Sequence, residues 1–272
     1  MGSDSRWDAE LGAAVAAARA GGRAALAFFG KASPVDWKAD DSPVGEADRA
    51  ADAAIRAHLR AACPDDAILT EESGAEAGRS GRRWIVDPVD GTRDFLRGVP
   101  NWANLIALEA RGDIVVGVLH LAALGRLYSA ARGQGAWRDG ARLRVPESAA
   151  LSRCVLVHGE PDCLLEALDV HAFARLARGV GMMRGHGAPY GAALYLEGQA
   201  DAWTEGTVSP WDIAPFVVLF EEAGARFSDL AGRRGWPYRS GLAAAPALHA
   251  ALLGLARGEG SCASPGGGSP RG

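Results

Sequence analysis

Residues 84–95 read WIVDPVDGTRDF and form the central run of the sequence. The apolar start predicts a buried strand that delivers Asp87, and Pro88, which has no backbone N–H to pair, is expected to end that strand. Asp90 follows at once, and the chain after Gly91 is predicted to be helical. In a purely structural interpretation, Asp90 caps this helix and Asp87 only hydrogen-bonds the turn. In both interpretations the run holds two carboxylates beside the start of a helix.

The two carboxylates suit a metal site. Hard divalent cations such as Mg²⁺ prefer oxygen ligands, and carboxylates this close in sequence repel each other unless a cation or a proton lies between them. The backbone N–H groups of Gly91, Thr92 and Arg93 are placed to bind phosphate oxygens, helped by the positive end of the helix dipole. The run therefore predicts a metal and a phosphate as neighbours.

Two more acidic motifs lie at the ends of predicted elements. Glu71 and Glu72 follow a short strand predicted at 67–69, and Asp212 follows Trp211 at the start of a helix. Adjacent glutamates are often only solvated charge, and an aspartate in a first helical turn stabilises the helix through its dipole. For Glu71 and Glu72 a functional role is nevertheless the favoured interpretation, whereas the Asp212 motif taken alone favours the structural one.

Hydrophobic periodicity divides the chain into two halves. Residues 1–150 are predicted to form an α+β half with helices over an antiparallel sheet, and residues 151–257 an α/β half in which strands and helices alternate. Residues 258–272 are mostly Gly, Ser and Pro and are predicted to be disordered. The helices are expected at 7–29, 46–61, 162–177, 189–197 and 210–223. The strands are expected at 67–69, 84–86, 105–109, 114–120, 127–131, 136–143, 154–157, 181–183, 202–204 and 225–228.

Composition narrows the function classes. A chain of 272 residues can bury a core of its own, and a net charge of −4 leaves no broad basic surface, so nucleic acid is not expected as the principal partner. Four dispersed cysteines without CxxC pairing argue against a zinc site or a disulfide scaffold, and favour the cytoplasm. Neither a signal peptide nor a membrane span is expected.

Taken together, the acidic motifs resemble those of a known family. They occur in the order TEES at 70–73, DPVDGT at 87–92 and WD at 211–212, with a weaker match at 38–44 ahead of Asp48. This order resembles the inositol monophosphatase-like superfamily of Mg²⁺-dependent, Li⁺-sensitive phosphatases, over roughly residues 7–257. The resemblance implies a layered αβαβα sandwich of the inositol monophosphatase / fructose-1,6-bisphosphatase type, and a homodimer.

The resemblance also implies a metal centre with two or three Mg²⁺ ions. One ion would be held by Glu71, Asp87 and the backbone carbonyl of Val89. A second would be held by Asp87, Asp90 and Asp212, and a third, weaker ion would lie near Glu71. The implied reaction is hydrolysis of a small phosphate monoester by in-line attack of metal-activated water, which needs no covalent intermediate. Consistent with that, no Ser, Cys or His in the sequence stands in a motif that is typical of a catalytic nucleophile.

Roles in catalysis and substrate binding are implied in the same way. The catalytic residues would be Glu71, Asp48, Thr92 and Asp87, with Asp48 hydrogen-bonding Thr92 to help activate the water. Substrate contacts are expected from Gly91, Thr92, Asp94, Arg184, Glu205 and Asp212. Among these, the backbone N–H groups of Gly91 and Thr92 would bind phosphate, and Glu205 would contact a hydroxyl or amine of the leaving group.

A second stretch bears on the substrate. RGVPNWA at 97–103 resembles the corresponding stretch of bacterial histidinol-phosphate phosphatases, which implies histidinol phosphate, although a loop merely buried by Trp102 would read the same way. The chain departs from the family at Gly45, where Thr is usual, at Asp94, where Asn is commoner, and at Ala188, where an acidic residue is expected. Inositol 1-phosphate, a sugar or nucleoside phosphate, 3′-phosphoadenosine 5′-phosphate and fructose 1,6-bisphosphate therefore stay open as substrates, as does a regulatory binding protein on the same fold.

Overall fold

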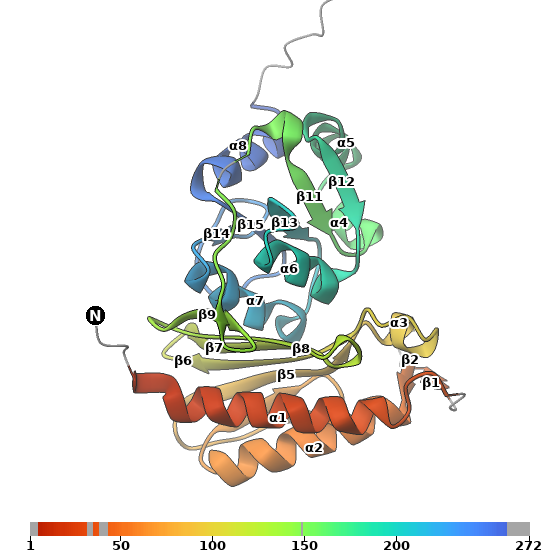
Figure 1. Cartoon of the computed structure of the whole chain (residues 1–272), viewed down its shortest axis with the longest axis vertical. Coiled ribbons are helices and arrows are strands. Elements are labelled where there is room, and N and C mark those ends of the chain that lie inside the picture. Colours follow the sequence, from red (N-terminus) through yellow and green to blue (C-terminus); the bar gives the residue numbers. More distant parts are fainter. Residues whose placement is uncertain (1–4, 32–34, 38–42, 148, 260–272) are drawn as a thin grey trace, which may run out of the picture.

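A computed structural model describes residues 5–31, 35–37, 43–147 and 149–259, and its elements stack in five layers (Figure 1). Two helices cover the outside of an eight-stranded sheet, two more lie between this sheet and a five-stranded one, and further helices cover the far side. This order confirms the predicted αβαβα sandwich. Most of the weak motif at 38–44, and the predicted disordered tail from residue 260 onward, lie outside the described residues.

The first layer consists of α1 (Asp8–Leu26) and α2 (Glu46–Ala62), where helices were predicted. Glycines on the buried face of α1 let it approach its neighbours closely. A Cβ on Gly21 would lie 2.6 Å from Ile55 of α2, and one on Gly22 would lie 2.5 Å from His120 of the sheet. Larger side chains at these positions would push the outer layer off the sheet.

The eight-stranded sheet has the order β10-β9-β8-β7-β6-β5-β3-β4. Its pairs are antiparallel except β3 with β5, which is parallel, so the prediction of an antiparallel sheet is wrong at that pair. The reason is the path of the chain: β4 pairs with the outer edge of β3 before the chain returns to start β5. The strands are β3 (Ala67–Thr70), β4 (Gly74–Glu76), β5 (Arg82–Asp90), β6 (Ala103–Ala110), β7 (Asp113–Leu121), β8 (Arg126–Ala131), β9 (Gly135–Arg138) and β10 (Ala141–Arg142). A separate ribbon pairs β1 (Val35–Trp37) with β2 (Pro43–Gly45).

Strand β5 continues past Pro88, so the prediction that this proline ends the strand is wrong. The pairing with β6 instead slips between Asp87 and Asp90, where three steps along β5 correspond to two along β6. Such a bulge accommodates a residue that has no N–H to pair. The carbonyl of Pro88 accepts a hydrogen bond from Nδ2 of Asn104 at 2.6 Å. The bulge re-aims the end of the strand, where both aspartates lie.

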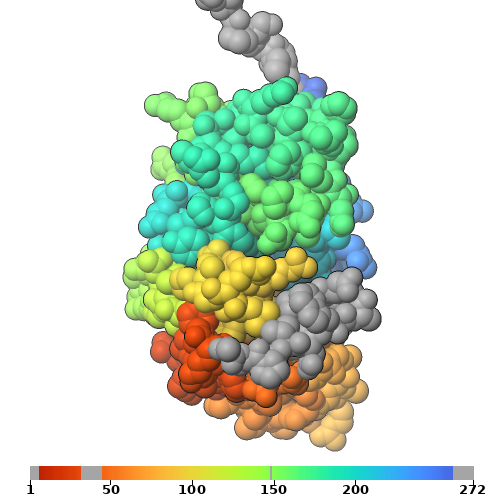
Figure 2. Space-filling view, turned by 90° about the vertical axis from the view of Figure 1, so that its right-hand side faces the viewer, coloured from red at the N-terminus to blue at the C-terminus, as the bar shows by residue number. Residues whose placement is uncertain are grey.

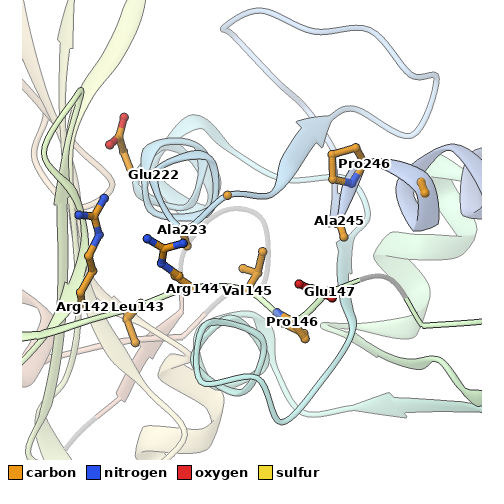
Figure 3. Close-up of a pocket in the computed structure, with 12 residues that line it drawn as sticks. Arg142, Leu143, Arg144, Val145, Pro146, Glu147, Glu222, Ala223, Ala245 and Pro246 are labelled. Carbon is orange, nitrogen blue, oxygen red and sulfur yellow. The ribbon is translucent and has the colours of Figure 1, made fainter.

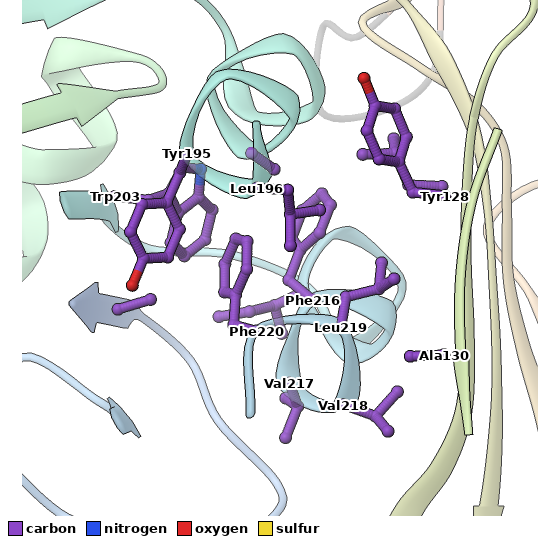
Figure 4. Close-up of a cluster of buried hydrophobic side chains, with 14 of the residues drawn as sticks. Tyr128, Ala130, Tyr195, Leu196, Trp203, Phe216, Val217, Val218, Leu219 and Phe220 are labelled. Carbon is purple, nitrogen blue, oxygen red and sulfur yellow. The ribbon is translucent and has the colours of Figure 1, made fainter. Parts of the chain in front are cut away.

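The middle layer consists of α6 (Ala188–Leu196) and α7 (Pro210–Glu222). Figure 4 shows α7 between the strand that carries Ala130 and the segments that carry Tyr195 and Trp203. Because α7 is covered on both sides, it is apolar around almost its whole circumference, as a helix buried in the core must be. On the sheet side, a Cβ on Gly117 would lie 2.5 Å from the carbonyl oxygen of Pro215, so glycine permits this close approach.

The second sheet has the order β12-β11-β13-β15-β14, from β11 (Val155–His158), β12 (Met182–Gly185), β13 (Ala202–Glu205), β14 (Arg226–Ser228) and β15 (Gly241–Ala244). The outer helices are α4 (Pro161–Ala167), α5 (Val170–Gly179) and α8 (Pro246–Arg257). The single helix expected at 162–177 is therefore wrong, because Asp169 caps a new helix by accepting a hydrogen bond from the N–H of Ala172 at 2.8 Å. β15 and α8 were not predicted. Within the described ranges, no helix combines the length and the apolar character needed to cross a bilayer.

Candidate active site

The central run places two aspartates at the bulged end of β5. Asp87 is 2% exposed, and its Oδ1 accepts a hydrogen bond from the N–H of Val89 at 2.9 Å. Asp90 lies on the other side of the bulge, and its Oδ2 is enclosed without a hydrogen-bond partner among the described residues. A buried, unpartnered carboxylate oxygen is costly, so this atom indicates a missing positively charged ligand or a proton.

Two further carboxylates approach these aspartates from other elements. Glu71 stands in the turn after β3, and Asp212 in the first turn of α7. Burial, followed by the charges of Glu71, Asp90 and Asp212, raises the pKa of Asp87 well above its usual range. The pKa of Asp90 is raised by burial first and then by Asp212, Glu205 and Glu71. The fold thus brings together the four side chains predicted as metal ligands, at an electrostatic cost that a cation would relieve.

The donor set fits a hard divalent cation, since every candidate ligand offers oxygen. As the side chains stand, no three His, Cys, Asp or Glu residues in the described part of the chain converge closely enough to hold one ion. Some oxygens are instead engaged with backbone N–H groups: Oδ2 of Asp212 accepts a hydrogen bond from the N–H of Ser209 at 2.8 Å, a cap that was not predicted for this residue. Asp212 therefore caps α7 and also faces the cavity described below.

The predicted partners Asp48 and Thr92 meet beside the aspartates. Asp48 is 2% exposed at the start of α2, where its Oδ2 accepts a hydrogen bond from the N–H of Gly45 at 2.8 Å. The hydroxyl of Thr92 lies 3.2 Å from Oδ1 of Asp48 and 2.9 Å from the carbonyl oxygen of Val89. The hydroxyl has one proton, so it donates to one of these acceptors at a time. Burial is the main cause that raises the pKa of Asp48.

The turn at Gly91 connects β5 to α3 (Thr92–Leu96). Gly91 has φ of 88°, in the left-handed region that favours glycine. Helix α3 has only five residues, so its dipole is expected to contribute less to phosphate binding than the backbone N–H groups of the turn do. The backbone of this turn is packed against residues 101–102, because a Cβ on Gly91 would lie 2.8 Å from the carbonyl oxygen of Asn101.

Replacing Gly91 with Ala is expected to lower kcat/KM by more than about tenfold, because the new Cβ would strain the turn and displace it from Asn101. Gly98→Ala is the matched control, since Gly98 also has a positive φ of 71° but open space around its Cβ position. Both variants pay the left-handed backbone penalty of about 1–2 kcal/mol. Steady-state kinetics and melting temperatures of the two proteins decide the point. Equal kinetic losses in both would contradict a role for the close packing at Gly91.

A cavity of about 150 Å³ opens where the α3 region meets the second half of the chain. Figure 2 shows the yellow surface of the α3 region against the green surface of that half. The cavity is lined by Asp90, Gly91, Arg93, Asp94, Asn101, Glu160, Cys163, Gly187, Ala188, Pro189, Glu205, Thr207, Val208 and Asp212. Predicted metal ligands and predicted substrate contacts therefore share one space.

Two of the predicted substrate contacts, Thr92 and Arg184, are not among the residues that line this cavity. Arg184 is exposed on β12 and is not a lining residue. Trp102 is fully buried, with ring centroids 4.9 Å from Phe95 and 5.6 Å from Phe29, as the structural interpretation of its stretch expected. Its neighbour Asn101 does line the cavity, and Nδ2 of Asn101 donates to the carbonyl of His186. The 97–103 stretch thereby ties the first half of the chain to the second.

Sequence reasoning missed Glu160, which lines the cavity from the β11–α4 connection, and Cys163, which lines it from the first turn of α4. A signal was available for Glu160, because it follows a buried strand and precedes Pro161 at a helix start. Glu71 was predicted from the same pattern, in which an acidic residue follows a strand. The sequence does not show that the end of β11 lies beside the end of β13, which carries Glu205, and this proximity brings Glu160 to the site.

Glu205 is a second cavity residue whose pKa is strongly raised. It is 3% exposed, and its Oε2 lacks a partner within the described residues. Burial is the main cause that raises its pKa from 4.5 to about 8, and the charges of Asp212, Glu160 and Asp162 contribute further. The folded protein therefore keeps this side chain protonated in a pH range where the unfolded chain has already lost the proton.

The metal-free protein is expected to lose stability as the pH rises from about 4.5 to about 8, the window that the raised pKa of Glu205 defines. Glu205→Gln removes this contribution, so its melting temperature should fall less across the window than that of the wild type. Thermal unfolding in chelator at several pH values measures the difference, with Glu166→Gln, an exposed carboxylate of α4, as control. Parallel curves for the wild type and Glu205→Gln would contradict the raised pKa.

A larger cavity of about 680 Å³ lies elsewhere, between the connection after β10 and the start of α8 (Figure 3). Arg142 ends β10, Arg144 lies in the connection that follows, and Ala245 and Pro246 lie at the start of α8. The cavity contains none of the predicted site residues. The predicted site residues on its walls, rather than its volume, therefore identify the smaller cavity as the candidate active site.

Comparison with known proteins gives concordant matches. The model of the inositol monophosphatase family matches residues 7–260. The histidinol-phosphatase of Chlorobaculum parvum is 40% identical over 83% of this chain and 87% of its own length. The inositol-1-monophosphatase of Mesorhizobium japonicum is 38% identical over 82% of this chain and 86% of its own length. Among solved structures, the extragenic suppressor protein suhB from Bartonella henselae has a TM-score of 0.86 at 31% identity, covering 92% of this chain and 98% of its own.

Proposed function

Because this chain belongs to the inositol monophosphatase family, we propose that it hydrolyses histidinol phosphate to histidinol and phosphate with the help of Mg²⁺. The protein is a phosphoric monoester hydrolase, as its relatives are. The observation that carries the proposal is that the charges of Glu71, Asp87, Asp90 and Asp212 act on one another beside the Gly91 turn. Carboxylates gathered at such electrostatic cost are characteristic of sites tuned for chemistry.

In this proposal the carboxylates hold two or three Mg²⁺ ions. Glu71, Asp87 and the carbonyl of Val89 would hold one, and Asp87, Asp90 and Asp212 another. Bound Mg²⁺ would supply a lowered pKa for the attacking water and charge neutralisation for the departing alkoxide. The enclosed oxygen of Asp90 then gains the positive partner that it lacks among the described residues.

The neighbouring residues would position the reactants. Backbone N–H groups at Gly91 and Thr92 would bind phosphate oxygens and fix the phosphorus for in-line attack. The hydroxyl of Thr92, within hydrogen-bond distance of Asp48, would orient the attacking water and pass a proton toward the buried carboxylate. The raised pKa of Asp48 suits a group that must accept a proton.

Histidinol phosphate is supported by two independent features. Three relatives at 38–40% identity are histidinol-phosphatases. The cavity is also strongly acidic, with Asp94, Glu160 and Glu205 on its walls in addition to the proposed metal ligands. An acidic wall favours a leaving group that carries a positive charge, such as the protonated amine of histidinol, over a neutral one.

Inositol 1-phosphate is the second candidate substrate, since relatives at 37–38% identity are inositol-1-monophosphatases. Glu205 could accept a hydrogen bond from a hydroxyl as well as from an amine. We further propose, from the family resemblance, that the enzyme is a cytoplasmic homodimer inhibited by Li⁺.

A substrate panel tests the proposal. Phosphate release is measured with Mg²⁺ from histidinol phosphate, inositol 1-phosphate, fructose 1,6-bisphosphate, 3′-phosphoadenosine 5′-phosphate and nucleoside monophosphates. The expected result is the highest kcat/KM for histidinol phosphate. A higher value for inositol 1-phosphate would replace the substrate but keep the chemistry. Turnover of none of them, with Mg²⁺ shown to be bound, would refute the catalytic proposal in favour of a binding role.

A further inference from the structure

Both walls of the candidate active-site cavity carry carboxylates, but the one positively charged side chain among its described lining residues lies on the wall from α3. The wall from α3 contributes Arg93 and the backbone N–H groups of the Gly91 turn, which suit a phosphate. The opposite wall contributes Glu160 and Glu205, and Arg93 is the only positively charged side chain among the residues that line the space. Within the described residues, the second wall offers a phosphate no positively charged group, so a bound monoester is oriented with its leaving group toward Glu160 and Glu205.

The second wall is held together by an unusually close backbone approach. A Cβ on Gly159 would lie 1.9 Å from Oε2 of Glu205, so the absence of a side chain at Gly159 makes the position of Glu205 possible. A Cβ on Gly206 would likewise lie 2.0 Å from the carbonyl oxygen of Cys163. These contacts fix the end of β11 against the end of β13. They thereby bring Glu160, the residue directly after Gly159, to the edge of the same space as Glu205.

This wall also contains a buried group without a partner. Oε2 of Glu205 is enclosed and makes no hydrogen bond within the described residues, although Oε1 accepts one from the N–H of Gly206 at 3.2 Å. Asp162 does not relieve the local charge, because it is itself a carboxylate whose Oδ1 accepts from the N–H of Cys163. A buried carboxyl group with one unpartnered oxygen, in a residue that lines the cavity next to a second carboxylate, matches a ligand that brings both hydrogen-bond donors and positive charge.

We propose that Glu160 is a specificity residue that, together with Glu205, binds a protonated amine on the leaving group of the substrate. The inference rests on the proposed function, because it names the residue that selects an amino-alcohol phosphate over a neutral polyol phosphate at that site. Glu160 is exposed at the mouth of the cavity whereas Glu205 is buried in it. Glu160 therefore meets the charged end of the leaving group first, and Glu205 supplies the inner acceptor. Ala188, where an acidic residue was expected from the family, lines the same cavity, so Glu160 supplies a carboxylate that position 188 lacks.

The test compares Glu160→Gln with the wild type on two substrates, histidinol phosphate and inositol 1-phosphate. The variant should raise the KM for histidinol phosphate roughly fivefold, the upper range for an exposed ion pair, with little change in kcat. The KM for inositol 1-phosphate should stay the same or fall. Glu166→Gln is the matched control, because this carboxylate lies on α4 near the wall but does not line the cavity. It should leave both KM values unchanged.

Calorimetric binding of histidinol alone separates this inference from the proposed reaction. If histidinol phosphate is not hydrolysed but histidinol binds and Glu160→Gln weakens that binding, the proposed reaction fails and the subsite stands. If histidinol phosphate is hydrolysed and Glu160→Gln changes both substrates equally, or neither, the subsite is refuted and the reaction stands. Histidinol that does not bind to the wild type, together with an unchanged KM in the variant, also overturns the subsite.

Discussion

The Asp90→Asn variant is expected to lose nearly all phosphatase activity and to unfold at a higher temperature than the wild type when both are metal-free. The opposite signs have one cause. Asp90 adds negative charge to a group that already contains Asp87 and Asp212, and its enclosed Oδ2 has no partner within the described residues. A group that costs stability in the empty site and is required for the reaction is characteristic of a ligand to a catalytic ion.

The expected sizes of the loss of activity and of the change in melting temperature both follow from the position of the Asp90 carboxylate. Loss of a direct metal ligand should cost more than the roughly 10–100-fold that loss of an outer partner costs. Removing an unsatisfied charge should stabilise the metal-free protein by about 1–3 kcal/mol, and a change of 1 kcal/mol shifts the melting temperature by about 2–4 °C in a protein of this size. In saturating Mg²⁺ the order should reverse, because only the wild type gains the full binding energy.

Asp94→Asn is the matched control for this experiment. Asp94 lines the same cavity but is not a proposed metal ligand, so its variant should keep the Mg²⁺-induced rise in melting temperature. Phosphatase activity and melting temperature are measured with and without Mg²⁺ for the wild type and both variants. An Asp90→Asn protein with wild-type activity and a wild-type response to Mg²⁺ would remove Asp90 from the metal centre.

Asp212→Asn is expected to lower kcat/KM by a similarly large factor while leaving the helix that it caps intact. Asn accepts a hydrogen bond from a backbone N–H nearly as well as Asp does, so the contact with Ser209 can be kept. What the variant loses is the charge that faces Asp87 and Asp90. Kinetics and circular dichroism on the same sample separate the two roles of this residue.

The control for Asp212 is Asp169→Asn, which makes the same change at the cap of α5, away from the cavity. It should leave kcat/KM unchanged. If Asp212→Asn were as active as this control, Asp212 would have only a structural role at the start of α7.

Much of the candidate site could be predicted from the sequence because several of its residues are close together in the chain. Asp87 and Asp90 are three residues apart and follow an apolar strand, so their proximity did not depend on the rest of the fold. Gly91 is required for a backbone reason that one residue type expresses directly. The behaviour of Pro88 was mispredicted because a bulge against β6 lets the strand continue, and the pairing partner is not visible in the run itself.

The place of Glu160 in the cavity could not be predicted from the sequence. Its place in the cavity depends on β11 and β13 being neighbours, on the absence of a side chain at Gly159, and on the packing of the second half against α3. None of these is a property of the residues next to it. Asp169 marks a different limit: its cap splits one predicted helix into two, although the apolar periodicity continues across the break. Pattern alone does not decide between a cap and a helical interior when both fit.

The central claim, that the carboxylate cluster is a Mg²⁺-dependent phosphatase centre, is tested most directly by titrating Mg²⁺ into chelator-treated protein while phosphate release from histidinol phosphate is recorded. We expect no release before Mg²⁺ is added, and a saturable rise that parallels an increase in melting temperature over the same concentrations. Phosphate release that is undiminished by chelation, or that stays absent while Mg²⁺ raises the melting temperature, would contradict the claim.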